Sequence, residues 1–395
     1  LFFARKLYRM NLLTIGDFYR QRYDRKVEVV TGIAIALSYL GWVSAQVTAL
    51  GLVFNVLSDG VITQQQGIMI GAAIVLMYTL YGGMWSVALT TFFQMIIIVI
   101  GLFYIATLLS DMAGGVGPVI EHASANAKFG FWPEMNAVAM IAFISGLLTM
   151  GFGSIPQQDV FQRVTSARNE NTAVRGSLLG AGAYFLLAFV PMYLAYSALL
   201  VNPEMVNGLL KAGDREIQLI LPNFVLAHMP LFAQVMFFGA LLSAILSTSS
   251  GALLAPTALF TENVVKPLFG QMSDKRFLLA LRLILVCFTA GVLVFALNNT
   301  STMYEMVQNA YKVTLVGAFV PLACGIYWHR ASTQGALVSS LGGLAVWVIC
   351  ERFFAEADIP PQMWGLFASV IGMLVGSFAP QLIRDIDRFT KAGSL

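Results

Sequence analysis

Long apolar runs, separated by short polar or glycine- and proline-bearing connectors, dominate this sequence. A helix of about 20 apolar residues crosses the roughly 30 Å core of a bilayer, and ten runs approach or exceed that length. We therefore predict an all-α polytopic membrane protein with ten transmembrane helices, at residues 29–57, 67–82, 87–110, 137–155, 174–201, 229–260, 276–297, 302–326, 332–353 and 361–383.

The composition supports this fold class. Hydrophobic residues make up 58% of the chain and charged residues 11%, against about 25% charged in an ordinary soluble domain. So few charges cannot cover a water-exposed surface. The small net charge of +3 and the three scattered cysteines also exclude nucleic-acid-binding and disulfide-scaffold classes. We expect membrane lipid around the helices, no nucleic-acid ligand and no obligatory protein partner.

The basic residues give an independent check on the topology. Of the 23 lysines and arginines, Lys128, Lys211, Arg215 and Arg352 fall in alternate loops and Lys312 falls within a span, which leaves 18 for the other side. Such a bias marks the cytoplasmic side. We therefore predict a multi-pass protein of the plasma or inner membrane with both ends cytoplasmic. The end segments are then a basic segment at 1–28 and a tail at 384–395.

Ionisable residues inside a span are candidates for function by default. Glu305 and Lys312 lie seven residues apart, two turns along one helical face, and could form an intramembrane charge pair. Two roles remain open for Lys312. It could clamp neighbouring helices together, or it could line a solute pathway.

A stripe of polar and aromatic residues lies near the middle of the first span. Tyr39, Trp42 and Gln46 are spaced i, i+3 and i+7, so they share one helical face. Interfacial aromatic belts explain tryptophans near span ends but not Trp42 at mid-depth. Packing against a neighbouring helix and contact with a solute both remain possible.

The segment 243–251, Ser-Ala-Ile-Leu-Ser-Thr-Ser-Ser-Gly, is the densest group of polar residues within a span. Serine and threonine hydroxyls in a helix fold back toward carbonyls three or four residues earlier. The hydroxyls of Ser247 and Thr248 would both approach the carbonyl of Ala244. Three such oxygens without a carboxylate suit a weakly bound monovalent cation such as sodium. The same hydroxyls could instead allow close helix packing.

Four motifs together resemble the sodium/solute symporter family, whose members couple sodium to the transport of small organic solutes. Their order and spacing agree over nearly the whole chain. The motifs are Ala244-Ile245-Leu246-Ser247-Thr248 with Thr261-Glu262-Asn263, Leu13-Thr14-Ile15-Gly16-Asp17-Phe18 with Arg22-Tyr23, Tyr81-Gly82-Gly83-Met84-Trp85-Ser86-Val87 through Gln94, and Pro156 with Phe161-Gln162-Arg163 and Ala167-Arg168.

The resemblance implies a five-plus-five inverted repeat with sites near the bilayer midplane. On that plan, residues 29–326 resemble core helices three to ten, and residues 327–383 form two additional transmembrane helices. The first two core helices would then be missing from the start of the chain, in keeping with its start at Leu1 rather than methionine.

The resemblance also implies a sodium site made by the Ala244 carbonyl and the Ser247 and Thr248 hydroxyls. Thr91 stands where some members have an aspartate that binds a second sodium, and Gly251 stands where they can have a hydroxyl. We therefore expect one sodium rather than two. The residues expected along the solute pathway are Tyr39, Trp42, Gln46, Ser145, Thr149, Gln308, Asn309 and Lys312. Lys312 there would favour a solute with a carboxylate.

The predicted function is thus sodium-coupled import of a small organic solute by alternating access, with sodium co-transported and no organic cofactor. The alternative is a membrane-embedded solute sensor of a signalling protein, as some proteins with this module are fused to kinase domains. A channel is less favoured because no repeated filter or charged ring is visible. An enzyme is not expected, because His122, His228 and His329 have no nucleophile–base pattern near them.

Overall fold

The computed structural model describes residues 2–270 and 272–383, apart from the side chains of 82–87. Every element among these residues is a helix. In chain order they are α1 Ala4–Arg9, α2 Ile15–Arg22, α3 Arg25–Leu57, α4 Gln64–Met112, α5 Val116–Ala125, α6 Ala137–Gly153, α7 Gln158–Thr165, α8 Glu170–Val201, α9 Pro203–Ala212, η1 Glu216–Leu219, α10 Ile220–His228, α11 Leu231–Phe260, η2 Thr261–Val265, α12 Lys266–Phe269, α13 Asp274–Asn298, α14 Met303–Thr314, η3 Leu315–Phe319, α15 Val320–Tyr327, α16 Thr333–Phe353 and α17 Pro361–Phe378.

Eight helical stretches within the described residues are long and apolar enough to cross a membrane. A ninth is the pair α6 and α7, which are bent by 51° at the break between them. The fold class is therefore confirmed, while the predicted number of ten spans is not. The eight stretches are Arg25–Leu57, Ala88–Met112, Glu170–Val201, Leu231–Phe269, Asp274–Asn298, Met303–Tyr327, Thr333–Phe353 and Pro361–Phe378.

The predicted span at 67–82 forms part of α4, which is helical throughout its 49 residues. Nevertheless α4 folds back on itself, because the hydroxyls of Tyr78 and Thr90 are hydrogen-bonded to each other. Residues 12 apart in a straight helix are separated by about 18 Å along its axis, beyond the reach of two side chains. The helix therefore has two arms. The glycine-pair turn predicted at 81–87 lies mostly within the side chains that are not described.

The long helix α3 lies at the centre of the bundle and packs against α4, α11, α13 and α14. Its contact with α14 is very close, since a Cβ on Gly41 would lie 2.8 Å from the carbonyl oxygen of Met306. A glycine at this position lets the two backbones approach, as small residues do in membrane helix packing. The stripe that includes Trp42 is thereby held beside α14.

Among the described residues, two helices contain a turn of π-helix, and a proline follows each turn. The turn η2 is followed by Pro267 and the turn η3 by Pro321. Proline has no N–H, and its ring displaces the carbonyl four residues earlier. That carbonyl belongs to Asn263 in η2 and to Gly317 in η3. Widening the turn by one residue accommodates the ring, and such π-turns are frequent at functional sites.

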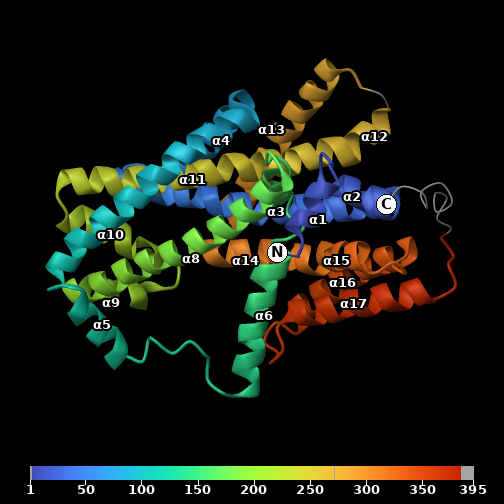
Figure 1. Ribbon diagram of the computed structural model, residues 1–395. Helices are drawn as coiled ribbons and strands as arrows, with labels where there is room; N and C mark the ends of the chain where they lie inside the picture. Colours follow the sequence, from blue (N-terminus) through green and yellow to red (C-terminus); the bar gives the residue numbers. More distant parts are fainter. Residues whose placement is uncertain (1, 271, 384–395) are drawn as a thin grey trace.

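The last two helices, α16 and α17, pack along each other and against η3. A buried hydrogen bond of 2.8 Å joins the Ser339 and Ser369 hydroxyls across this pair. Figure 1 shows α1, α2 and α12 toward one end of the bundle and α5, α9 and α10 toward the other. Helices α1 and α2, from the basic segment expected on the cytoplasmic side, therefore lie toward the same end as α12.

Candidate functional site

The hydroxyl-rich segment forms the middle of α11, where Ala244, Ser247 and Thr248 are each partly exposed. The Ser249 hydroxyl turns the other way and donates to the carbonyl of Ile245 at 2.6 Å. The Ser250 hydroxyl donates to the Ser247 carbonyl at 3.1 Å. Helical spacing therefore places Ala244, Ser247 and Thr248 on an accessible face with neutral oxygens to offer.

The second arm of α4 lies against this face. The hydroxyl oxygens of Thr91 and Ser247 are 2.9 Å apart and share a hydrogen bond. The Thr248 hydroxyl makes no hydrogen bond to the described side chains or carbonyls, so it is available as a ligand. Within the described residues, no group of three or more His, Cys, Asp or Glu side chains could hold a metal ion. A set of neutral oxygens suits a monovalent cation that must also leave.

A guanidinium group lies next to the same segment. A Cβ on Gly251 would be 3.1 Å from an Nη of Arg163. Arg163 also forms an ion pair of 3.2 Å with Asp159 on its own helix, α7. The guanidinium beside Gly251 thus has its charge balanced by the Asp159 carboxylate.

The contact between α3 and α14 places two aromatic rings together. The ring centroids of Trp42 and Tyr311 are 5.0 Å apart with the rings tilted by 54°. The Trp42 indole N–H is buried and has no hydrogen-bond partner among the described residues. Gln46 and Gln308 are half-buried on these two helices, while Asn309 is exposed. An aromatic face with an unsatisfied donor can hold an organic solute.

Three other pathway candidates are bonded within the protein. The Tyr39 hydroxyl donates to the Asp159 carboxylate and so joins α3 to α7. Ser145 accepts a hydrogen bond of 2.9 Å from the Gln362 amide of α17. The Thr149 hydroxyl donates to the Ser145 carbonyl at 2.7 Å. The structure thus places these side chains in contacts between or within helices.

Lys312 has a different partner from the one its spacing indicated. Its ammonium lies 3.4 Å from the carboxylate of Glu351 in α16. Glu305 instead accepts a hydrogen bond from the backbone N–H of Thr302 and caps its own helix. A capping residue is held at the first turn, which keeps Glu305 away from a partner two turns along. The Glu305–Lys312 pair is therefore corrected to Lys312–Glu351.

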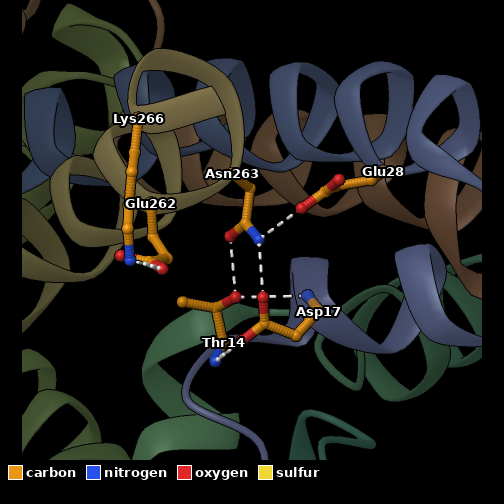
Figure 2. A network of polar contacts seen from close by, with 6 residues as sticks. All are labelled: Thr14, Asp17, Glu28, Glu262, Asn263 and Lys266. Atoms are coloured by element: carbon orange, nitrogen blue, oxygen red, sulfur yellow. Dashed lines mark hydrogen bonds and ion pairs between the residues drawn. The ribbon is translucent and has the colours of Figure 1, made fainter. Parts of the chain in front are cut away.

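A buried polar cluster at the start of α2 was not assigned any role from the sequence. Figure 2 shows Asn263 of η2 between Thr14, Asp17 and Glu28. Thr14 and Asp17 also form a capping box at the start of α2. The Thr-x-x-Asp spacing is a sequence signal for that cap. No local pattern indicates that Asn263, 249 residues beyond Thr14, completes the cluster.

Comparison with known proteins gives consistent results. The profile of the sodium:solute symporter family matches residues 1–343. The chain is 26% identical over 356 residues to the high-affinity choline transporter 1 of Homo sapiens, covering 87% of the chain and 59% of that transporter. It is 23% identical over 398 residues to a sodium/proline symporter of Staphylococcus aureus, covering 95% of the chain and 73% of that symporter.

A solved structure shares the fold. The substrate-bound outward-open state of a Na+-coupled sialic acid symporter has a TM-score of 0.77 and 18% identity, covering 96% of this chain and 80% of that one. The chain spans about 59% of the length of the choline transporters that it matches.

Proposed function

The chain belongs to the sodium:solute symporter family, and from this we propose that it forms part of a carrier that couples sodium entry to the import of a small organic solute. The family and the similar proteins are transporters rather than enzymes. The observation that carries the proposal is the accessible face of α11, where Ser247 and Thr248 offer neutral oxygens next to Thr91. The similar proteins are named as carriers, which favours this function over a solute sensor.

In the proposed site, sodium is bound by the Ala244 carbonyl and the hydroxyls of Ser247 and Thr248. We propose a single sodium. Thr91 supplies a hydroxyl rather than a carboxylate, and the Arg163 guanidinium lies beside Gly251. The lack of a carboxylate at position 91 disfavours a second cation at this segment.

The solute is proposed to bind against the faces of α3 and α14 that carry Trp42, Gln46, Gln308 and Tyr311. Choline and proline, the solutes after which the similar transporters are named, both contain a positively charged nitrogen. Such a nitrogen is attracted to the face of an aromatic ring. Because Lys312 is paired with Glu351, it gives no support for a carboxylate on the solute.

Transport would proceed by alternating access. A ligand shifts a conformational equilibrium only through its different affinities for the two states. Sodium bound at Ser247 would favour the state that binds solute, and a membrane potential drives its entry with about 2.3 kcal/mol per charge per 100 mV. We propose that both chain ends are cytoplasmic in the cell membrane. The gathering of α1, α2 and α12 at one end of the bundle supports this orientation (Figure 1).

The site assignment can be tested with sodium-dependent thermal stabilisation of the full-length protein. Sodium at ten times its Kd stabilises the native state by about 1.4 kcal/mol. We expect this stabilisation, and sodium-dependent uptake, to be lost in Ser247→Ala and in Thr248→Ala. The matched control is Ser249→Ala, whose hydroxyl bonds within α11 on the buried side. Wild-type sodium dependence in both site variants would show that these hydroxyls serve packing only.

A further inference from the structure

The short helix α2 contacts both of the π-turns described above. The turn η2 follows α11, which contains the hydroxyl-rich segment, and the turn η3 follows α14, which contains Tyr311. A π-turn before a proline disturbs the regular pairing of helix carbonyls, so other donors must satisfy them. Side chains of α2 and of its C-terminal residue Tyr23 donate to carbonyls of η3 and α15, and the Asn263 side chain of η2 bonds to α2, to the residue before it and to Glu28 of α3.

The contact of α2 with η3 and α15 uses three side chains. The Tyr19 hydroxyl donates to the Ala318 carbonyl at 2.9 Å, and the Tyr23 hydroxyl donates to the Pro321 carbonyl at 2.7 Å. The Arg22 guanidinium donates to the Gly325 carbonyl at 2.9 Å. Burial raises the pKa of the Tyr19 and Tyr23 phenols above their usual value, so both remain protonated donors at physiological pH.

The contact of α2 with η2 passes through one side chain, Asn263 (Figure 2). Its amide oxygen accepts a hydrogen bond of 2.7 Å from Thr14, and its amide nitrogen donates to Asp17 at 3.0 Å and to Glu28 at 2.8 Å. Both amide N–H donors and one acceptor position of Asn263 are thereby used. The fit is tight, because a Cβ on Gly16 would lie 2.5 Å from Asn263.

Glu28 makes this contact sensitive to the loss of Asn263. Glu28 is 1% exposed, and its second carboxylate oxygen is buried without a partner among the described residues. The Asn263 amide is therefore the side-chain donor on which Glu28 depends. A buried polar group that loses its partner incurs its full desolvation cost. We therefore expect the hydrogen bonds of Asn263 to Thr14, Asp17 and Glu28 to break together rather than one at a time.

We propose that α2 is a clamp that couples the two π-turns, with Asn263 and Tyr19 as its positioning residues. The clamp links the end of α11 to the end of α14 through hydrogen bonds on opposite sides of one two-turn helix. Asn263 lies 16 residues beyond Ser247, about 24 Å along the helix. Its functional meaning rests on the proposed function. Sodium held at Ser247 would be coupled, through the clamp, to the helix that faces the solute.

The clamp is tested by amide hydrogen–deuterium exchange of the full-length protein. In Asn263→Ala we expect exchange in residues 315–327 to rise at least tenfold, although the Asn263 side chain is hydrogen-bonded to Thr14, Asp17 and Glu28 and not to that segment. In the reciprocal variant Tyr19→Phe, which removes one oxygen, exchange in residues 261–266 should rise. The reciprocal variant decides the question if Asn263→Ala fails to fold.

Two matched controls separate coupling from general destabilisation. Asn169→Ala removes the asparagine cap of α8, and Tyr8→Phe removes a phenol oxygen that makes no hydrogen bond among the described residues. Neither should change exchange in residues 261–266 or 315–327. The clamp is refuted if Tyr19→Phe and Asn263→Ala leave the opposite turn within twofold of wild type, or if the controls raise exchange equally.

Adding sodium distinguishes the clamp from the proposed function. Sodium should slow exchange in residues 244–251 of the wild type and of Asn263→Ala, but should slow exchange in 315–327 only in the wild type. Equal slowing of 315–327 in both proteins would refute the coupling. If sodium slows neither segment in the wild type, the sodium site is refuted, while the two reciprocal variants still decide the clamp.

Discussion

Substitutions in the ion pair between Lys312 and Glu351 test whether these charges stabilise the bundle or bind the solute. The Lys312 side chain is 12% exposed and the Glu351 side chain 40% exposed, and their charged atoms are 3.4 Å apart. Glu351 also accepts a hydrogen bond of 3.0 Å from the Trp347 indole. The test uses Lys312→Gln, Glu351→Gln and the double variant.

Because the two side chains differ in exposure, we expect the two single variants to lose different amounts of stability. At 3.4 Å and an effective dielectric constant of about 20, the attraction is about 5 kcal/mol before desolvation is subtracted. Glu351→Gln leaves a nearly buried ammonium without its counter-charge, and we expect a loss of about 2 kcal/mol in the free energy of unfolding. Lys312→Gln leaves a carboxylate that water and Trp347 still solvate, so we expect a loss of about 1 kcal/mol.

The measurement is a double-mutant cycle on unfolding in detergent, combined with solute uptake. We expect a coupling energy of about 1 kcal/mol between the two positions and a KM for the solute within twofold of wild type in Lys312→Gln. The reasoning is refuted if the single effects add without coupling. It is also refuted if Lys312→Gln raises KM more than tenfold, since Lys312 would then contact the solute.

Three further predictions concern the sites and their packing. The Hill coefficient for sodium should be near 1 and should rise in Thr91→Asp, which supplies a carboxylate for a second sodium site. A wild-type value near 2 would exclude the single-sodium proposal. Trp42→Ala should raise KM for a solute with a cationic nitrogen at least tenfold, about 1.4 kcal/mol. The control is Trp328→Ala, because Trp328 packs on Phe378; this variant should leave KM unchanged. Gly153→Ala should destabilise the protein by about 1–3 kcal/mol, because the added Cβ would clash with a carbonyl of α14. The control Gly146→Ala, whose Cβ would have nothing within 4 Å, should leave thermal unfolding unchanged.

The helical fold could be predicted from the sequence because spanning a bilayer imposes a minimum apolar length. Eight predicted spans coincide with apolar helices of that length, and the one at 137–155 continues into a bent pair with α7. The span at 67–82 was harder to predict, because glycine lets a helix change direction without ending it. The fold-back of α4 follows from the contact between Tyr78 and Thr90, which periodicity does not predict.

Most of the side-chain partners could not be predicted from the sequence. Helical periodicity places Glu305 and Lys312 on one face, but it contains no information about α16, which carries the true partner Glu351. The same limit applies to Tyr39, whose hydroxyl reaches Asp159, 120 residues later. Periodicity identifies which residues share a face, while tertiary packing decides which of them meet. The sodium and solute assignments therefore stay predictions.

The distribution of carboxylates separates residues that hold the bundle from residues that can exchange a cation. Asp17, Glu28, Asp159 and Glu351 each accept hydrogen bonds from the protein, and their positions join different helices. A carboxylate in the sodium site would bind a monovalent cation strongly, because cation affinity rises with the charge of the ligands. A carrier must release its cargo in every cycle, so tight binding would slow it. The neutral hydroxyls on α11 suit repeated binding and release, while the acids near the helix ends, which are bonded to other helices, suit a fixed scaffold.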